Sequence, residues 1–231
     1  VVAGGVWSSL FCRSVGVRFQ QLKVLASVLR TAPMDGGPDT AAWGPGLALR
    51  KRLDGGYTVA SGGVVADIEP DNFRFLTDFI PVLKQEWGGI AFRFGKSFFA
   101  QQRLLDGWSS GTTSPFEKMR ILDPQPSDAE NRRARANLET TFPAFKGVPT
   151  AASWGGMIDA TPDLVPVISE VDSIPGLVLS SGYSGHGFGI GPGAGRLTAE
   201  IAAGKTPVVD PRPFRFSRYT DGSRPRPLTG F

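Results

Sequence analysis

Apolar and polar positions along the chain predict a mixture of strands and helices. Residues 23–30 have the apolar density and β-branched content of a long strand. Residues 47–53 and 57–60 flank an Asp-Gly-Gly turn at 54–56, and glycine permits the positive φ angles of a tight turn, so a hairpin is predicted. Further strands are predicted at residues 116–122, 150–158, 165–168 and 177–181.

Helical spacing of apolar residues predicts two longer helices. One runs from residue 71 or 72 to about 86, with a kink at Pro81. The other opens with a capping box at residue 127 and continues to about 141. Shorter helices are predicted at residues 8–14 and 196–203. Strands, helices and hairpin connections in this order favour an α+β fold with an antiparallel sheet.

The densest glycine run, residues 182–195, is predicted to be a turn between a strand and the helix at 196–203. Glycine lets the backbone approach a flat ligand, and the first N–H groups of a helix carry partial positive charge. His186, the only histidine of the chain, lies in this run. The run therefore indicates a site for an anion or an electron-rich ring edge; the alternative is a tight corner without a ligand.

Composition narrows the possible functions. Net charge is +4 and 20% of residues are charged, and no aromatic pattern accompanies the basic residues, so nucleic acid is not expected as a partner. The single cysteine, Cys12, excludes an internal disulfide framework and a multi-cysteine metal site, and it is expected to be buried. No apolar run reaches the roughly 18 residues that a membrane span needs. We therefore expect a cytoplasmic protein with no bound metal.

Four motifs occur along the chain, beginning at Val1, Ser114, Trp154 and Gly182, and they read VVAGGVWS, SPFE, WGGMIDATPDLVPVI and GYSGHGF. In this order they resemble the D-amino acid oxidase superfamily, and within it the glycine oxidase, sarcosine oxidase and D-amino acid dehydrogenase branch. The resemblance spans nearly the whole chain. It implies FAD-dependent oxidation of a C–N bond in a small amine or amino acid, with hydride transfer to the flavin.

The resemblance also implies a division of the chain. Residues 1–20 would be a remnant of the FAD-binding domain, 21–170 the substrate-binding domain, 171–205 a strand, loop and helix that contact FAD, and 206–231 an extended tail. The expected fold is α+β, with a mostly antiparallel substrate-domain sheet flanked by helices, plus a remnant strand and the C-terminal helix of an FAD-binding domain.

The G-x-G-x-x-G turn that seats the ADP half of FAD in this superfamily does not occur in the sequence. The resemblance therefore implies a C-terminal portion, alone inactive, that needs an N-terminal FAD-binding segment or a partner chain supplying it. A second interpretation is a non-catalytic binding or assembly subunit that keeps the substrate-domain fold. Flavin absorbance in the purified protein would distinguish the two.

Site residues follow from the same motifs. Cofactor contacts are implied for Gly5, Trp7, Gly185, His186, Gly187, Phe188 and Gly189. His186 is the candidate catalytic residue, with an electrostatic or orienting role, because hydride transfer mostly requires positioning of the amine. Candidate substrate contacts are Trp154, Met157 and Ile158. Side chains alternate along a strand, so at most one of Met157 and Ile158 faces the pocket.

Two departures from the family pattern leave the substrate open. Ile158 stands where glycine oxidase-like proteins carry an arginine for the substrate carboxylate, and Gly189 where sarcosine oxidase-like proteins can use a lysine. Either Arg93, Arg120 or a residue outside the chain binds a carboxylate, or the substrate is a less polar or bulkier secondary amine, or an amine whose carboxylate lies further away. The aromatic cluster of Phe92, Phe94, Phe98 and Phe99 is expected in the core.

Overall fold

The centre of the computed structural model is a six-stranded sheet in the order β2-β3-β4-β1-β6, with β5 paired to β4 beside this path. The structure describes residues 1–105, 112–223 and 225–228. The pairings are antiparallel except that of β4 with β5, so the predicted α+β class with a mostly antiparallel sheet is confirmed. The strands are β1 (Leu22–Thr31), β2 (Ala42–Gly44), β3 (Leu47–Lys51), β4 (Tyr57–Asp67), β5 (Ile90–Arg93) and β6 (Thr150–Ala160).

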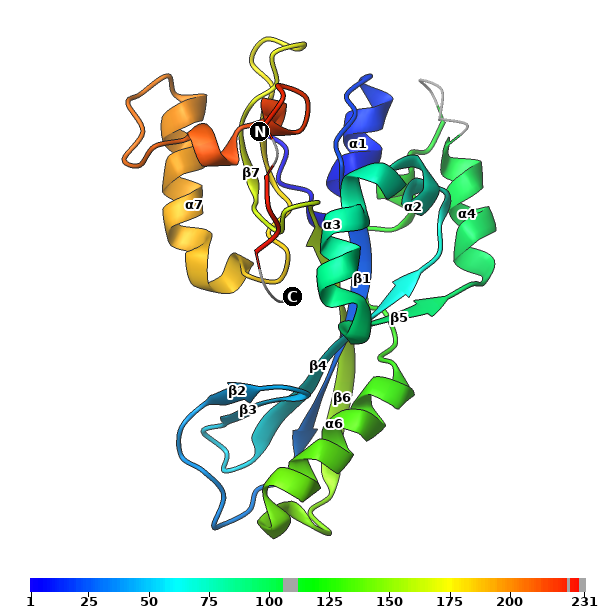
Figure 1. Ribbon diagram of the computed structural model, residues 1–231, viewed down its shortest axis with the longest axis vertical. Coiled ribbons are helices and arrows are strands. Elements are labelled where there is room, and N and C mark those ends of the chain that lie inside the picture. Colours follow the sequence, from blue (N-terminus) through cyan, green and yellow to red (C-terminus); the bar gives the residue numbers. More distant parts are fainter. Residues whose placement is uncertain (106–111, 224, 229–231) are drawn as a thin grey trace.

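Helices cover the two ends of this long sheet differently. Helix α6 lies along its lower half, and α1 to α4 gather around its upper half (Figure 1). A second sheet of β7 (Val167–Glu170) and β8 (Val178–Ser181) packs against α7 on the other side of the upper half. The helices are α1 (Ser8–Ser14), α2 (Pro70–Arg74), α3 (Leu76–Glu86), α4 (Lys96–Leu105), α5 (Pro115–Lys118), α6 (Asp128–Thr141) and α7 (Gly187–Ala202).

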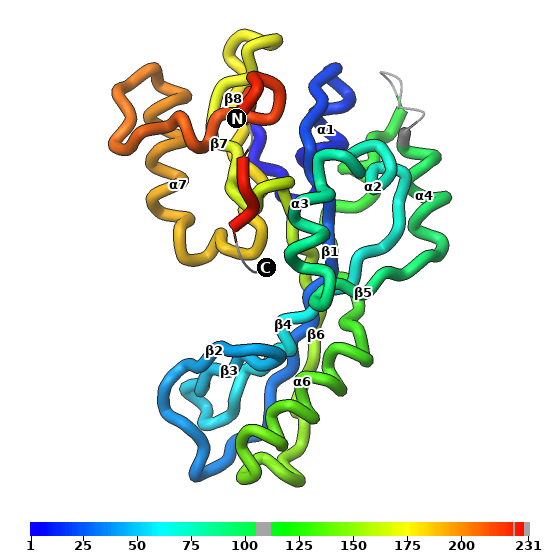
Figure 2. Tube along the Cα trace, viewed as in Figure 1, coloured from blue at the N-terminus to red at the C-terminus, as the bar shows by residue number. Residues whose placement is uncertain are grey.

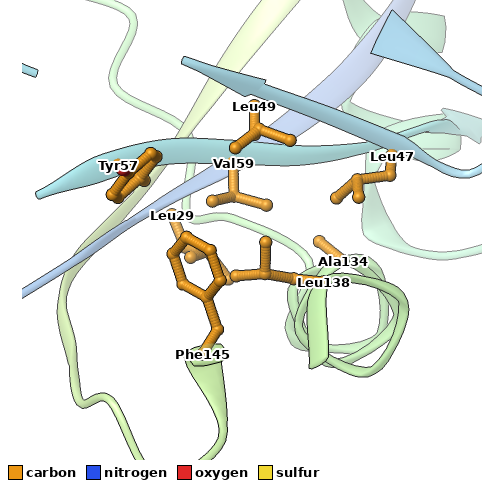
Figure 3. Packing of buried hydrophobic residues seen from close by; sticks show 8 residues of the cluster. All are labelled: Leu29, Leu47, Leu49, Tyr57, Val59, Ala134, Leu138 and Phe145. Carbon is orange, nitrogen blue, oxygen red and sulfur yellow. The ribbon is translucent and has the colours of Figure 1, made fainter. Parts of the chain in front are cut away.

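The lower half has a closed apolar core between the sheet and α6. Leu138 and Ala134 of α6 face the sheet, and the ring of Phe145 meets that of Tyr57 edge-on at 4.8 Å (Figure 3). Ser127 Oγ accepts the Glu130 N–H at 3.4 Å, as the predicted capping motif requires. The core comprises Leu29, Leu47, Leu49, Tyr57, Val59, Ala134, Leu138 and Phe145.

The helix predicted from residue 71 or 72 to 86 is broken into α2 and α3. Phe75 leaves helical geometry at φ −107° and ψ 12°, and its ring is buried with Leu164 and Ala160. Tertiary packing of this ring outweighs local helix propensity at the break. The helical spacing of apolar residues that predicted this helix is confirmed in α3, because Phe79 and Val82 are buried in the same cluster.

Two predictions in the middle of the chain are wrong. Residues 116–122 do not form a strand: Ser114 and Glu117 cap each other, with Ser114 N–H donating to Glu117 Oε2 at 2.7 Å, and this capping box starts the short helix α5. The aromatic cluster is not core either. Phe92, Phe94 and Phe99 are exposed on β5, the following loop and α4, at the edge of the upper half.

The segment from residue 206, expected as an extended tail, docks on the second sheet over much of its length. It forms 3-10 turns at Arg212–Phe214 and Phe216–Tyr219, and Phe216 N–H donates to Ser169 Oγ at 2.8 Å. Figure 2 shows this segment, coloured from orange to red, beside β7. Residues 224 and 229–231 of the predicted tail lie outside the described residues.

Candidate functional site

The glycine run after β8 is mostly helix. Helix α7 begins at Gly187 with His186 as its N-cap, so the predicted turn over residues 182–195 is wrong for most of its length. Packing of Ala194 and Leu197 against Ile168 holds this part of α7 on β7 although glycine is a poor helix former. The true turn is confined to the residues between Ser181 and His186.

That turn has an unusual backbone. Gly182 at φ 81°, Ser184 at φ 50° and Gly185 at φ 86° all adopt left-handed conformations. Left-handed backbone is costly for a residue with a Cβ, and Ser184 is one of two such residues in the described chain. The turn is therefore held in shape by its surroundings rather than by local preference.

The start of α7 faces open space. Gly185, His186 and Gly189 are exposed, and the Phe188 side chain is fully exposed at 102%. The first N–H groups of a helix have no intrahelical acceptor, and no side chain caps them here. A Cβ added at Gly189, Gly191, Gly193 or Gly195 would meet nothing within 4 Å. Neither left-handed backbone nor packing within the described chain requires these four glycines, although each costs about 1 kcal/mol relative to alanine in a helix.

The N-terminal segment lies beside this turn. Val2 pairs in parallel with Leu179 of β8, through Val2 N–H to Val178 O at 2.8 Å and Ser180 N–H to Val2 O at 2.9 Å. The chain then makes a 3-10 turn over Gly5–Trp7. The motifs that begin at Val1 and Gly182 therefore meet in space, although more than half of the chain separates them.

A buried polar cluster joins the two turns, and we call it the Asp159 cluster. Asp159 Oδ2 accepts from Gly182 N at 2.7 Å, and from Ser181 Oγ and Gln21 Nε2 at 3.2 Å each. Gln21 Nε2 also donates to Gly5 O at 3.0 Å. Burial raises the pKa of Asp159, and the hydrogen bonds from the Gly182 backbone and Ser181 oppose part of that rise. The cluster consists of Ser8, Gln21, Asp159, Ser181 and the main chain of Gly5 and Gly182.

A cavity of about 460 Å³ opens beside the Gly5–Trp7 turn. Its size is within the range typical of small-molecule sites. Trp7, Gln21 and Met157 line it, which links it to the Asp159 cluster through Gln21. Its apolar walls include Leu10, Leu22, Leu104, Met119, Leu122 and Met157.

The charges on the cavity wall are largely paired. Three lining carboxylates each have a basic partner, and the pairs are Glu69 with Lys23 at 2.9 Å, Asp67 with Arg93 at 2.5 Å, and Asp71 with Arg13. Burial raises the pKa of Glu69, and the charge of Lys23 opposes this. Lys118 also lines the cavity, and no described carboxylate lies within ion-pair distance of its ammonium. Lys118 is thus the lining cation left to meet an anionic ligand.

The predicted substrate residues separate onto two faces of β6. Met157 lines the cavity, whereas Ile158 packs with Val24 and Val64 on the opposite face. Side chains of this pair therefore alternate as expected for a strand, with only Met157 at the cavity, and their contact with substrate stays a prediction. Trp154 lies on the same face of β6 as Ile158, is 39% exposed and does not line the cavity, so its contact with substrate stays a prediction.

Sequence reasoning missed Gln21 and Lys118. The polar pair Gln20-Gln21 directly before an apolar strand was a usable signal, and Lys118 follows the SPFE motif immediately. His186 and the rest of the α7 start do not line the cavity. Arg93, considered for a substrate carboxylate, is instead bidentate to Asp67 at 2.5 and 3.0 Å. Cys12 is fully buried as expected, and burial raises its pKa to about 12.

Within residues 1–105, 112–223 and 225–228, none of the helices combines the length and apolar character that crossing a bilayer requires. In the same ranges, no three His, Cys, Asp or Glu side chains gather as ligands for a metal ion would.

Comparisons with known proteins agree with the motif resemblance. L-amino acid deaminase from Proteus vulgaris superposes with a TM-score of 0.86 at 30% identity, over 94% of this chain and 50% of that one. The Proteus myxofaciens L-amino acid deaminase solved with anthranilate gives 0.88 at 33% identity, over 95% and 49%. A glycine oxidase of Pseudomonas aeruginosa is 29% identical over 93 residues, 40% of this chain and 26% of that protein.

The chain thus spans about half the length of the two deaminases. A family model described as FAD dependent oxidoreductase matches residues 1–201. Since that match covers most of the 231 residues, the chain belongs to the family of FAD dependent oxidoreductases.

Proposed function

We propose that this chain supplies the substrate-binding part, and one wall of the cofactor site, of an enzyme that oxidises a C–N bond in an amine or amino acid with FAD. The observation that supports it most is the open start of α7 beside the Gly5–Trp7 turn. Family membership gives the cofactor, and the cavity beside Trp7 gives a place for a small substrate.

The residues present fit a flavin. Exposed N–H groups at the start of α7 favour an electron-rich ring edge, and the glycines there leave room for close approach. The corner would not fit if apolar side chains packed it shut, but Phe188 points into solvent. A ligand or another segment that packs closely on the glycines at 189, 191, 193 and 195 would explain why these helix positions have no side chain.

When bound, the flavin supplies a hydride acceptor. The N–H groups of Gly187, Phe188 and Gly189 would stabilise negative charge at that edge of the site. His186, exposed and making no capping bond, is free to donate a hydrogen bond there, which supports an orienting role. Trp7 and Met157 would orient the substrate in the cavity.

The charge pattern of the cavity favours a substrate that carries a carboxylate. The acidic lining residues are already paired, so the cavity presents the Lys118 ammonium among apolar walls. We propose that the Lys118 ammonium binds the substrate carboxylate, a role that the apolar side chain of Ile158 does not fill. An amino acid with an apolar side chain fits this arrangement, because the walls contact the side chain while the ammonium contacts the carboxylate.

The remaining contacts to FAD are proposed to come from outside these residues, since the chain spans only about half of its deaminase relatives. They belong either to a segment joined to the chain or to a partner chain. The alternative of a non-catalytic subunit makes the opposite prediction, namely that no arrangement of the full-length protein binds flavin.

The experiment is a flavin titration of the full-length protein followed by anaerobic reduction with a panel of amines and amino acids. We expect flavin absorbance to co-purify or be restored, and His186→Ala to slow reduction with little change in thermal stability, because the side chain is exposed. Lys146→Ala, an exposed change beside the lower core, is the matched control. A protein that never takes up FAD would refute the proposal, and unchanged reduction in His186→Ala would remove this residue from the site.

A further inference from the structure

Asp159 is an unusual carboxylate because it accepts hydrogen bonds from the backbone and from neutral side chains instead of pairing with a cation. Its Oδ2 receives hydrogen bonds from Gly182, Ser181 and Gln21. No basic side chain of the described residues lies within ion-pair distance of it. Burial raises its pKa, so the site carries an electrostatic penalty that a neutral residue would avoid. Stability alone therefore does not explain why a carboxylate occupies this buried position.

The hydrogen bonds that Asp159 accepts from the turn before α7 explain its position. Its Oδ2 accepts the Gly182 N–H at 2.7 Å, and its main-chain oxygen accepts the Ser184 N–H at 2.9 Å. Gly182 and Ser184 are two of the left-handed residues in the turn before α7. A single residue of β6 thus fixes the strained turn at two points, and strained backbone persists only where its surroundings over-determine it.

The same oxygen reaches the other turn. Gln21 Nε2 contacts both Asp159 Oδ2, at 3.2 Å, and Gly5 O, at 3.0 Å. Ser181 Oγ contacts the same two acceptors, at 3.2 and 3.3 Å. Gln21 and Ser181 are 3% and 0% exposed, so water does not compete for these bonds. The Asp159 cluster therefore locks the Gly5–Trp7 turn against the turn that leads into His186.

We infer that Asp159 is a positioning residue: it holds the Gly5–Trp7 turn and the start of α7 in the mutual arrangement that the cofactor site needs. It acts through the two turns and does not itself contact substrate. This inference rests on the proposed function, since the turns matter for catalysis only if they face FAD. The comparison of three carboxylate variants in the full-length protein tests it.

The variants are Asp159→Ala, Asp159→Asn and, as a matched control, Glu130→Gln. Asn retains an acceptor for Gly182 N–H, whereas Ala retains none. Glu130 is a buried carboxylate of α6 that accepts from Ser61 Oγ at 2.6 Å in the lower half, with no bond to either turn. Two readouts are compared: amide hydrogen exchange of residues 182–188 without flavin, and the rate of flavin reduction with it.

We expect Asp159→Ala to speed exchange across residues 182–188 by roughly tenfold through loss of the hydrogen bonds to the carboxylate. Flavin reduction should slow on the order of 10- to 100-fold, since small misplacements of site groups have effects of that size. KM should change little, because Asp159 does not line the cavity. Asp159→Asn should recover most of both losses, and Glu130→Gln should alter neither.

Unchanged exchange at residues 182–188 in Asp159→Ala would overturn the inference, as would loosened exchange with normal flavin reduction. If Asp159→Ala does not fold, Gln21→Met replaces it: exchange should rise near Gly5 while the Gly182 bond and its protection remain. Equal exchange at both turns in that variant would also contradict the inference. Failure of the wild-type protein to bind FAD would instead refute the proposed function, and the exchange data would still show whether Asp159 holds the turn.

Discussion

Two aspartates four positions apart, Asp159 and Asp163, are stabilised in opposite ways. Asp163 faces a cation: Arg218 Nε and Nη2 donate to its two oxygens at 2.7 and 3.0 Å, and Tyr219 OH donates at 2.8 Å. Both side chains of that ion pair are 3% exposed. Asp159 faces only amide and hydroxyl donors. One carboxylate binds the C-terminal segment, and the other binds the two turns of the candidate site.

The difference separates stability from function in the upper half of the molecule. A buried arginine and carboxylate satisfy each other, and breaking such a pair is strongly unfavourable. Neutral donors stabilise a carboxylate less, but each hydrogen bond fixes the position of one neighbouring group, here the Gly182 N–H and the side chains of Ser181 and Gln21. We therefore expect changes at Asp163 to reduce stability first, and changes around Asp159 to affect the flavin site first.

The largest effect is expected for Arg218→Leu, which leaves Asp163 buried without its cation. The free energy of unfolding should fall by about 3–5 kcal/mol, and the C-terminal segment should become sensitive to protease. Urea unfolding and limited proteolysis of the full-length protein measure the two changes. Arg212→Leu, which breaks an exposed pair with Asp210, is the control and should leave stability unchanged.

Flavin content in folded Arg218→Leu protein should stay near that of wild type, because the Asp163 pair does not bond to either turn of the site. Loss of flavin at temperatures where the variant remains folded would show that Asp163 also supports the flavin site. The proposed separation between the roles of the two carboxylates would then be wrong.

Gly182→Ala should have a smaller effect on stability and a larger one on the site. A Cβ at this position would lie 2.3 Å from Thr161 Cγ2, and the backbone is left-handed at φ 81°. We expect a loss of about 1–3 kcal/mol in the free energy of unfolding and weaker flavin binding, from denaturation and flavin titration of the same samples.

The companion change Thr161→Ser removes the clashing methyl and keeps the hydroxyl that donates to Val165 O at 2.9 Å. Added to Gly182→Ala, it should restore part of the stability and flavin affinity, leaving only the backbone strain. No recovery in the double variant would mean that the clash is not what disturbs the turn.

The two carboxylates also show what the sequence could reveal. Strand and helix positions in the lower half follow local pattern and capping, and the Ser127 helix and the 54–56 hairpin formed as predicted. The motif resemblance correctly identified the family. The Asp163 pair could not be predicted, because 55 positions separate it from Arg218 and proline with arginine in the tail is typical of a solvated segment.

Predictions at the site failed for a related reason. Glycine density indicated a turn across residues 182–195, but packing of Ala194 and Leu197 on β7 keeps most of that run helical. The exposed rings on β5 and α4 were expected in the core because of their composition alone. The polar pair before the strand marks Gln21 in the sequence, but its partners Gly5, Asp159 and Ser181 come together only in the fold. Pairwise contacts over long separations carry this information, and single-chain patterns do not.

The smallest effect concerns pH. Burial raises the pKa of Asp159 above its ordinary value of 3.8, so at intermediate pH the folded state holds a proton that the unfolded chain has released. Stability from this group therefore declines as pH rises from about 3.8 to the raised folded pKa, and is constant above it. Asp159→Asn should remove that decline. The free energy of unfolding of the variant should therefore increase relative to that of wild type as pH rises through this window. Denaturation at a series of pH values measures it.

Asp221 provides the control of opposite sign for the pH series. Hydrogen bonds from Ser223 and Arg215 hold its pKa at about 2, so its contribution to stability is present above its ordinary pKa and is lost as pH falls toward that value. Relative to wild type, the free energy of unfolding of Asp221→Asn should therefore fall as pH rises from about 2 to 3.8, below the window in which that of Asp159→Asn rises. Parallel curves for Asp159→Asn and wild type across the window would show that neutral donors stabilise the ionised form of Asp159 as fully as water does, and the contrast with Asp163 would then rest on geometry alone.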